Sequence, residues 1–431
     1  MAGGKTKIDT AWERLFERHD ILARVNAGGS FRIASAQINE VREARLMAKF
    51  DRSIHLPEIF RKNQLSILPV TRGDYLIGPF VTHEPVRYQP ITPRPVENPR
   101  LETLNPDELY SEAAILLFAY NSGIIHDVMG SDTVRFTVNG RMASGVFSFS
   151  IRNKLQPHVP ATVEVQNSQI EIDAGFESPE AFLICEAKNQ ASEELLIRQL
   201  YYPYRLWVEK ISKPVIPAFL AFSNGVFHVF TYAFKDKFDY NSIDLRRHDA
   251  YAFMDEDITL QDIIELWRNT PVGVEPNAPF PQADSFLRVM DLLSILCGGE
   301  LTRTEVTLKY EFDPRQTSYY VSACEYLGFI ERFRTADNER GYRLTASARR
   351  TMSLPYRQKH LALIRKTLEN PVFHRAFGIF VETNSRPDKE KICQIMQESK
   401  FSHPINMTTI NRRSSTVIAW FDWMFRLAVT E

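Results

Sequence analysis

The sequence is poor in cysteine and has no long run of apolar residues. Its four cysteines are far apart in 431 residues and form no Cys-x-x-Cys pair, so neither a disulfide framework nor a zinc site is expected. The longest apolar stretches, such as residues 113–120, are far shorter than the ~18 residues that span a bilayer. The first residues also lack the apolar core of a signal peptide. We therefore expect a cytoplasmic protein without a membrane-spanning helix.

Net charge is also nearly absent, because the formal charge of the chain is −1. Taken alone, this value argues against a nucleic-acid partner, which needs a cationic surface. The charge is unevenly distributed, however. Residues 1–100 hold 16 Lys and Arg against 11 Asp and Glu, residues 281–431 hold 22 against 17, and residues 101–280 hold 14 against 25. Two basic flanks thus enclose an acidic middle region, although an excess of this size is also typical of ordinary solvated surface.

Two clusters of prolines lie close to the changes in the sign of the charge. They span residues 85–106 and 271–281, and proline neither donates to a β-ladder nor fits inside a helix. We interpret both clusters as extended connections between domains, which the chain length also favours. The expected domains cover residues 1–98, 99–270, 283–352 and 353–431.

The middle region contains two apolar strands with charged residues near their ends. Residues 169–176 include Asp173, and residues 181–187 include Glu186 and precede Lys188. Side chains alternate along a strand, so Glu186 and Lys188 share one face. If the two strands pair as a hairpin, Asp173 and Glu186 can converge on one divalent ion, and hard oxygen ligands suit Mg²⁺. A structural salt bridge at a sheet edge is the alternative for the same pattern.

Helices are expected before and after these strands. One begins after Ser111, with Glu112 in its first turn, where the helix dipole stabilises a carboxylate. The other is expected to begin with Ser192 as its N-cap and the acidic residues 193–194 in its first turn, and it carries Gln199.

The strand pattern resembles the PD-(D/E)XK nuclease superfamily, in which an Asp closes one strand and Glu-x-Lys closes the next. The matching residues here are Asp173, Glu186 and Lys188, and Ile172 stands where the superfamily motif has proline. The resemblance covers about residues 110–235. It implies an α/β fold, a PD-(D/E)XK nuclease core with a mixed sheet, flanked here by an N-terminal α+β domain and C-terminal winged-helix modules.

The resemblance also implies roles for individual residues. Asp173 and Glu186 would hold Mg²⁺, and Glu112 fits the place of a further metal-binding Glu that many members carry on the helix before the sheet. Lys188 would steady the attacking water and the developing charge. Some similar nucleases place a Gln on the following helix, so Gln199 completes the expected catalytic set.

The last region has the element order of a winged helix. Helices are expected over residues 286–296, 302–310 and 313–327, followed by strands over residues 329–333 and 341–344. The third helix of such a domain enters the major groove, where Arg reads guanine and Gln reads adenine. Winged helices also mediate protein contacts, which is the alternative here. The residues expected to contact DNA are Arg315, Gln316, Thr317, Ser318 and Arg340, with Arg412 and Arg413 in the last module, which is expected to be either helical or a second winged helix.

A metal-dependent nuclease core between DNA-contacting flanks resembles a type II restriction endonuclease. This resemblance implies sequence-specific hydrolysis of double-stranded DNA with Mg²⁺, by a homodimer at least on DNA, and a companion DNA methyltransferase acting on the same site. Residues 1–98 would then be a DNA-contacting domain. Two alternatives stay open: a modification-dependent DNA nuclease, and a non-catalytic winged-helix DNA-binding regulator.

Overall fold

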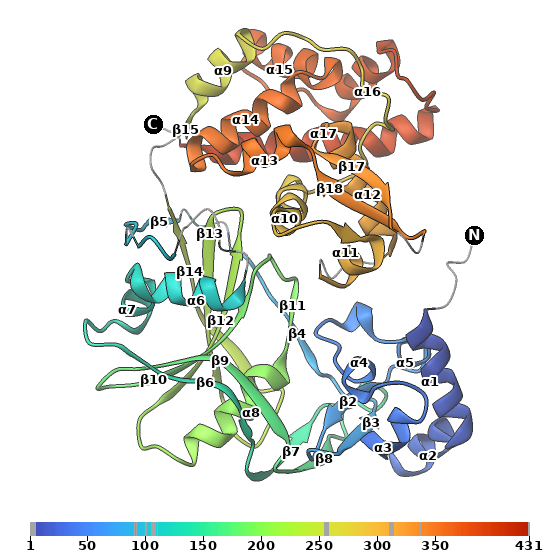
Figure 1. Cartoon of the computed structure of the whole chain (residues 1–431), viewed down its shortest axis with the longest axis vertical. Helices are drawn as coiled ribbons and strands as arrows, with labels where there is room; N and C mark the ends of the chain where they lie inside the picture. The colour runs from blue at the N-terminus through green and yellow to red at the C-terminus, as the bar shows by residue number, and fades with distance from the viewer. Residues whose placement is uncertain are drawn as a thin grey trace.

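The computed structural model describes residues 6–89, 91, 93–99, 101–104, 109, 111–253, 258–309, 314–335 and 338–429. Figure 1 shows three parts: a small N-terminal module (residues 6–78), a sheet module (residues 79–253) and a largely helical C-terminal module (residues 258–429) that lies above the other two in this view. Buried apolar clusters occupy each part. Among the described residues, no helix is long and apolar enough to cross a membrane.

The N-terminal module packs short helices against a three-stranded antiparallel sheet. Its first helix, α1 (Lys7–Arg18), begins with a capping box between Thr6 and Asp9. Trp12 of α1 lies edge-to-face against Phe60 in the core of the module. The remaining elements are α2 (Ile21–Gly28), β1 (Phe31–Ala34), α3 (Ser35–Asn39), α4 (Ala44–Met47), η1 (Ser53–His55), α5 (Glu58–Lys62), β2 (Ser66–Pro69) and β3 (Asp74–Gly78).

A seven-stranded mixed sheet forms the centre of the sheet module. Its strands are β5 (Arg94–Pro95), β6 (Arg135–Ala143), β9 (Gln169–Glu177), β10 (Phe182–Lys188), β12 (Val215–Ser223), β13 (Val226–Phe234) and β14 (Ile243–Ala252). They lie in the order β5-β14-β13-β12-β10-β9-β6. The pairs β10–β12 and β14–β5 are parallel, and the other neighbours are antiparallel. The mixed α/β character predicted from the sequence is therefore confirmed.

Helices cover both faces of strand β10. Its side chains alternate between two buried clusters: Phe182 packs in the cluster that includes α8 (Ile197–Val208), and Leu183 in the cluster that includes α6 (Glu112–Asn121). Helix α8 supplies the crossover that the parallel pair β10–β12 requires. Helix α6 begins at the predicted N-cap, because the Ser111 side chain accepts a hydrogen bond from the backbone N of the third helical residue at 3.1 Å. A short helix, α7 (Ile124–Met129), and a hairpin of β7 (Val146–Ile151) and β8 (Ala161–Gln166) complete this part.

The segment after β10 differs from the sequence prediction. Residues 194–196 form strand β11 (Glu194–Leu196), which pairs antiparallel with β4 (His83–Pro85). Helix α8 begins only after this strand, and the predicted N-cap at Ser192 is wrong, because its Oγ donates to the carbonyl O of Glu194 at 2.8 Å instead. Pairing with a strand far away in the sequence has overridden the local capping signal.

Within the C-terminal module, the helices and strands of residues 286–344 follow the expected order, with one short strand, residues 301–302, added after the first helix. These elements are α10 (Phe286–Cys297), β16 (Leu301–Thr302), α11 (Arg303–Lys309), α12 (Pro314–Tyr326), β17 (Ile330–Arg334) and β18 (Arg340–Leu344). Helices α13 (Ala346–Met352), α14 (Tyr356–Leu368), α15 (Pro371–Thr383), α16 (Lys389–Glu398) and α17 (Met407–Leu427) follow. The apolar cluster that holds the buried side chains of these helices also contains side chains from α9 (Leu260–Arg268), so α9 packs in the C-terminal core as well. At the ends of the module, β15 (Ile258–Thr259) pairs with β19 (Ala428–Val429).

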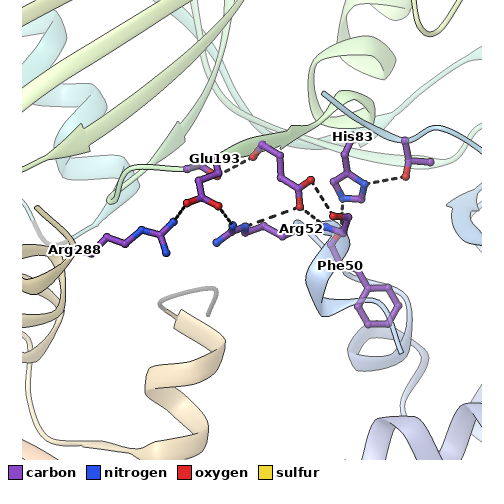
Figure 2. Close-up of polar contacts among 9 residues, drawn as sticks. Phe50, Arg52, His83, Glu193 and Arg288 are labelled. Atoms are coloured by element: carbon purple, nitrogen blue, oxygen red, sulfur yellow. Dashed lines mark hydrogen bonds and ion pairs between the residues drawn. The ribbon is translucent and has the colours of Figure 1, made fainter. Parts of the chain in front are cut away.

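An ion-pair network joins the three modules just after β10 (Figure 2). Glu193 accepts from Nη2 of Arg52, in the N-terminal module, at 3.0 Å and also pairs with Arg288 of α10. The neighbouring Glu194 accepts from Oγ of Ser53 at 3.0 Å. The connection that follows β10 is therefore held by both flanking modules.

The Glu193→Gln variant tests this connection. We expect it to lose only about 0.5–1 kcal/mol of unfolding free energy, because the Glu193 side chain is 64% exposed and exposed ion pairs stabilise weakly. The larger expected effect is faster limited proteolysis within residues 269–285, which lie in the C-terminal module directly before α10 and its Arg288. Glu209→Gln is the matched control, because Glu209 pairs with Lys237 inside one module. Equal proteolysis rates in the two variants would contradict a joining role for Glu193.

Candidate active site

Two neighbouring strands bring acidic side chains to the same part of the sheet. Strands β9 and β10 pair antiparallel with Cys185 opposite Ala174. Continuing this register by one residue puts Glu186 opposite Asp173. Oδ2 of Asp173 accepts from the backbone N of Ala187 at 2.9 Å, which ties this carboxyl to the end of β10. The hairpin predicted from the sequence is confirmed.

Lys188 lies between two carboxylates. Its Nζ donates to Oε1 of Glu186 at 2.7 Å and to Oε1 of Glu112 at 3.2 Å. Gln199, on α8, donates from Nε2 to the same oxygen of Glu186. The side chains of Glu186 and Lys188 are nearly buried, whereas that of Glu112 is 42% exposed, so the group is open to solvent on the α6 side. We call Glu112, Asp173, Glu186, Lys188 and Gln199 the carboxylate–lysine cluster.

Burial and neighbouring charges shift the protonation of this cluster. Burial and the charge of Glu186 raise the pKa of Asp173 to about 8, and burial raises the pKa of Glu112 above its usual value. Burial alone would lower the pKa of Lys188, but Glu186, Glu112 and Asp51 outweigh it and raise that pKa well above its ordinary range. Lys188 is therefore a charged hydrogen-bond donor at neutral pH and is not suited to act as a general base.

The donor set fits a small hard cation. Mg²⁺ is commonly held by one or two carboxylates, with water completing its coordination. Asp173 and Glu186 supply such a pair, and a cation between them would offset their mutual repulsion. No group of three His, Cys, Asp or Glu is arranged to hold a metal ion in the part of the chain that the structure describes. The fit therefore rests on this pair, with Glu112 held beside it by Lys188.

Two further charged residues, Lys49 and Asp51, lie near the cluster, and neither was expected from the sequence. The charge of Lys49 partly opposes the rise in the pKa of Glu112, and the charge of Asp51 contributes to the raised pKa of Lys188, so the segment between α4 and α5 approaches the cluster. Oδ1 of Asp51 is buried and has no hydrogen-bond partner within the described residues. No local sequence signal could have identified these residues, because tertiary packing of a different module brings them here.

The expected DNA contacts on α12 and β18 divide into exposed and buried side chains. Gln316, at the start of α12, and Arg340, at the start of β18, are exposed. Thr317 is fully buried, so the expectation that it contacts DNA is corrected: its side chain belongs to the interior. Ser318 is partly buried, and its Oγ accepts from Nη2 of Arg303 at 3.4 Å.

The remaining expected DNA contacts are arginines. The side chain of Arg315 lies outside the described part of the structure. Arg412 and Arg413 lie in the second turn of α17, whose N-cap is Asn406. A helical module and a second winged helix were the two expectations for this part of the chain. Arg412 is exposed, whereas Nε and Nη1 of Arg413 are buried without a partner among the described residues, and burial lowers the pKa of Arg413.

Three family models match consecutive parts of the chain, and each is described only as a domain of unknown function. DUF6996 matches residues 9–77, DUF6997 matches residues 78–252 and DUF7226 matches residues 288–429. The match over residues 78–252 contains the whole carboxylate–lysine cluster. No curated protein and no solved structure matches the chain.

Proposed function

We propose that the protein is a Mg²⁺-dependent endodeoxyribonuclease of the type II restriction class, which hydrolyses phosphodiester bonds of double-stranded DNA at a specific sequence. The observation that supports this proposal most strongly is the position of Lys188, which donates to both Glu186 and Glu112 beside the Asp173 carboxyl. A structural salt bridge needs one carboxylate for one lysine. Gathering a surplus of carboxylates around a nearly buried lysine costs free energy that a bound cation would offset.

The residues of the cluster divide the chemistry among them. Asp173 and Glu186 would hold Mg²⁺, which when bound supplies Lewis-acid polarisation of the scissile phosphate. Glu186 and Glu112 take two of the three N–H donors of Lys188, so the third can donate to the attacking water or to the phosphate oxygen on which charge develops, and the high pKa of Lys188 keeps it charged for this role. Gln199 orients the Glu186 carboxylate through its amide. Glu112 fixes the position of Lys188 from the other side.

The flanking modules would bring DNA to this centre. The proposal includes winged-helix recognition by the C-terminal module, a homodimer with one active site for each strand, and a companion methyltransferase that protects the host DNA. The exposed side chains of Gln316 and Arg340 support the recognition role, because they are free to contact DNA from solvent-facing positions.

Gln316→Ala tests the recognition surface. We expect it to weaken binding by about 1–3 kcal/mol, because an amide that reads a base edge contributes about that much to discrimination. The measurement is fluorescence anisotropy with a DNA fragment that the wild-type protein cleaves. Thr317→Val is the matched control: it changes the adjacent, buried side chain and should leave DNA affinity within about twofold. A larger loss in Thr317→Val than in Gln316→Ala would contradict the assignment.

The proposed activity is tested by incubating the purified protein with unmethylated and with methylated plasmid DNA, each with Mg²⁺ or with EDTA. Discrete fragments from unmethylated DNA that require Mg²⁺ are expected. Fragments from methylated DNA alone would support the modification-dependent nuclease. Binding without cleavage of either plasmid would support the non-catalytic regulator.

A further inference from the structure

A pocket of about 650 Å³ lies between the N-terminal and sheet modules. One wall comes from residues 53–65, which include α5, and the other from residues 152–157, which follow β7. Backbone hydrogen bonds hold the second wall in place: Val81 N donates to the carbonyl O of Arg152 at 3.0 Å, and Lys154 N donates to the carbonyl O of Pro79 at 2.6 Å. The pocket is therefore built from fixed backbone on the sheet side.

The charged side chains that line this pocket are all cationic: Arg61, Arg152 and Lys154. Arg61 and Arg152 are exposed and no ion pair among the described residues engages either of them, although the charge of Arg61 acts on Asp9 and that of Arg152 on Glu84. Lys154 is partly buried, its Nζ donates to Oγ of Ser66 at 2.8 Å, and burial lowers its pKa. Gathering three cations and burying one of them costs free energy, which an anion in the pocket would offset.

The size of the pocket and its uncharged walls indicate a ligand larger than a bare anion. A volume of about 650 Å³ lies within the range of small-molecule sites and exceeds what one inorganic phosphate fills. Ile54, Leu56 and Leu65 add apolar surface, and Gln64 and Asn153 add amide groups. A nucleotide combines a phosphate with an apolar sugar face and a polar base edge, which matches this combination of walls.

We propose that this pocket binds one phosphate of a DNA strand together with the adjoining nucleoside. The identity of the polymer rests on the proposed function, whereas the site itself is independent of the carboxylate–lysine cluster. Ser53, which lines the pocket, also binds Glu194 in the network of Figure 2. A strand bound here would thus contact Ser53, which itself binds the segment after β10.

The test compares the full-length protein with an Arg61→Gln/Arg152→Gln double variant. Binding of a fluorescein-labelled random-sequence duplex is measured in EDTA over a range of salt concentrations, so that cleavage plays no part. We expect the double variant to bind about 10- to 30-fold more weakly at low salt and to lose about one unit of the log–log salt slope, because the pocket holds one phosphate and each phosphate contact contributes about 0.9. An Arg61→Lys/Arg152→Lys variant, which keeps both charges, should bind nearly as the wild type does.

Arg45→Gln/Arg72→Gln is the matched control, because both arginines are exposed in the N-terminal module and neither lines the pocket. The control should bind within about twofold of the wild type. Equal losses in the two Gln double variants, or no loss in either, would overturn the pocket assignment. Displacement of DNA by inorganic phosphate alone at about millimolar concentration would assign the pocket to free phosphate and overturn the nucleotide claim. Absence of nuclease activity would refute the proposed function but leave this binding result intact.

Discussion

Replacing Lys188 with alanine is expected to reduce DNA cleavage by about 10³-fold or more while DNA affinity stays within about twofold of the wild type. The variant removes the only cation that the structure shows between Glu186 and Glu112 within the described residues, and with it the remaining N–H donor for the attacking water or the phosphate. The measurement is a single-turnover cleavage rate at saturating Mg²⁺, with binding measured separately in EDTA.

Lys213→Ala is the matched control for this experiment. Lys213 also belongs to the sheet module and pairs with a carboxylate, because its Nζ lies 2.5 Å from Oε1 of Glu177. This control should cleave DNA at the wild-type rate. Comparable cleavage by Lys188→Ala and Lys213→Ala would remove Lys188 from the mechanism, and a structural salt bridge would then account for its position.

Asp173→Asn is expected to abolish cleavage and yet to stabilise the metal-free protein at high pH. The folded-state pKa of Asp173, about 8, lies above the value of 3.8 for an exposed carboxyl. The favourable contribution of this group is therefore fully present below pH 3.8 and is lost as the pH rises through about 8. Asparagine cannot ionise, and its Oδ1 can still accept the hydrogen bond from Ala187 N. At about pH 9, the variant should exceed the wild type in unfolding free energy by on the order of a few kcal/mol.

Urea unfolding at acidic and alkaline pH, with and without Mg²⁺, measures this effect. Mg²⁺ should stabilise the wild type and have little effect on Asp173→Asn, because the variant lacks one of the two proposed ligands. Glu171→Gln is the control, since Glu171 lies on the same strand with an exposed side chain paired to Arg141. A variant that still cleaves DNA, or one whose stability relative to the wild type does not change with pH, would contradict the account.

The centre of the site could be predicted from the sequence because its determinants are local. Strand alternation puts Glu186 and Lys188 on one face, the hairpin brings Asp173 opposite Glu186, and a serine N-cap begins the helix that carries Glu112. Each of these relations spans few residues and follows from backbone geometry alone.

The parts that could not be predicted depend on contacts between distant segments. The helix expected at Ser192 gives way to strand β11 because β4, from much earlier in the chain, supplies a pairing partner. Thr317 turns inward because the core of the C-terminal module surrounds that side of α12. Asp51 approaches Lys188 only through the packing of the N-terminal module. Sequence patterns report which face of an element is apolar, but they do not report which partner covers it.

The most direct test of the central claim is to map the DNA ends that the wild-type protein and Glu186→Gln produce in the presence of Mg²⁺. Glu186 lies at the centre of the cluster, because Lys188 and Gln199 both donate to its Oε1. If the central claim holds, we expect defined ends with 5′-phosphates from the wild type, none in EDTA, and none from the variant while it still binds DNA. Identical ends from Glu186→Gln at the wild-type rate, or no ends from the wild-type protein on any double-stranded substrate, would contradict it.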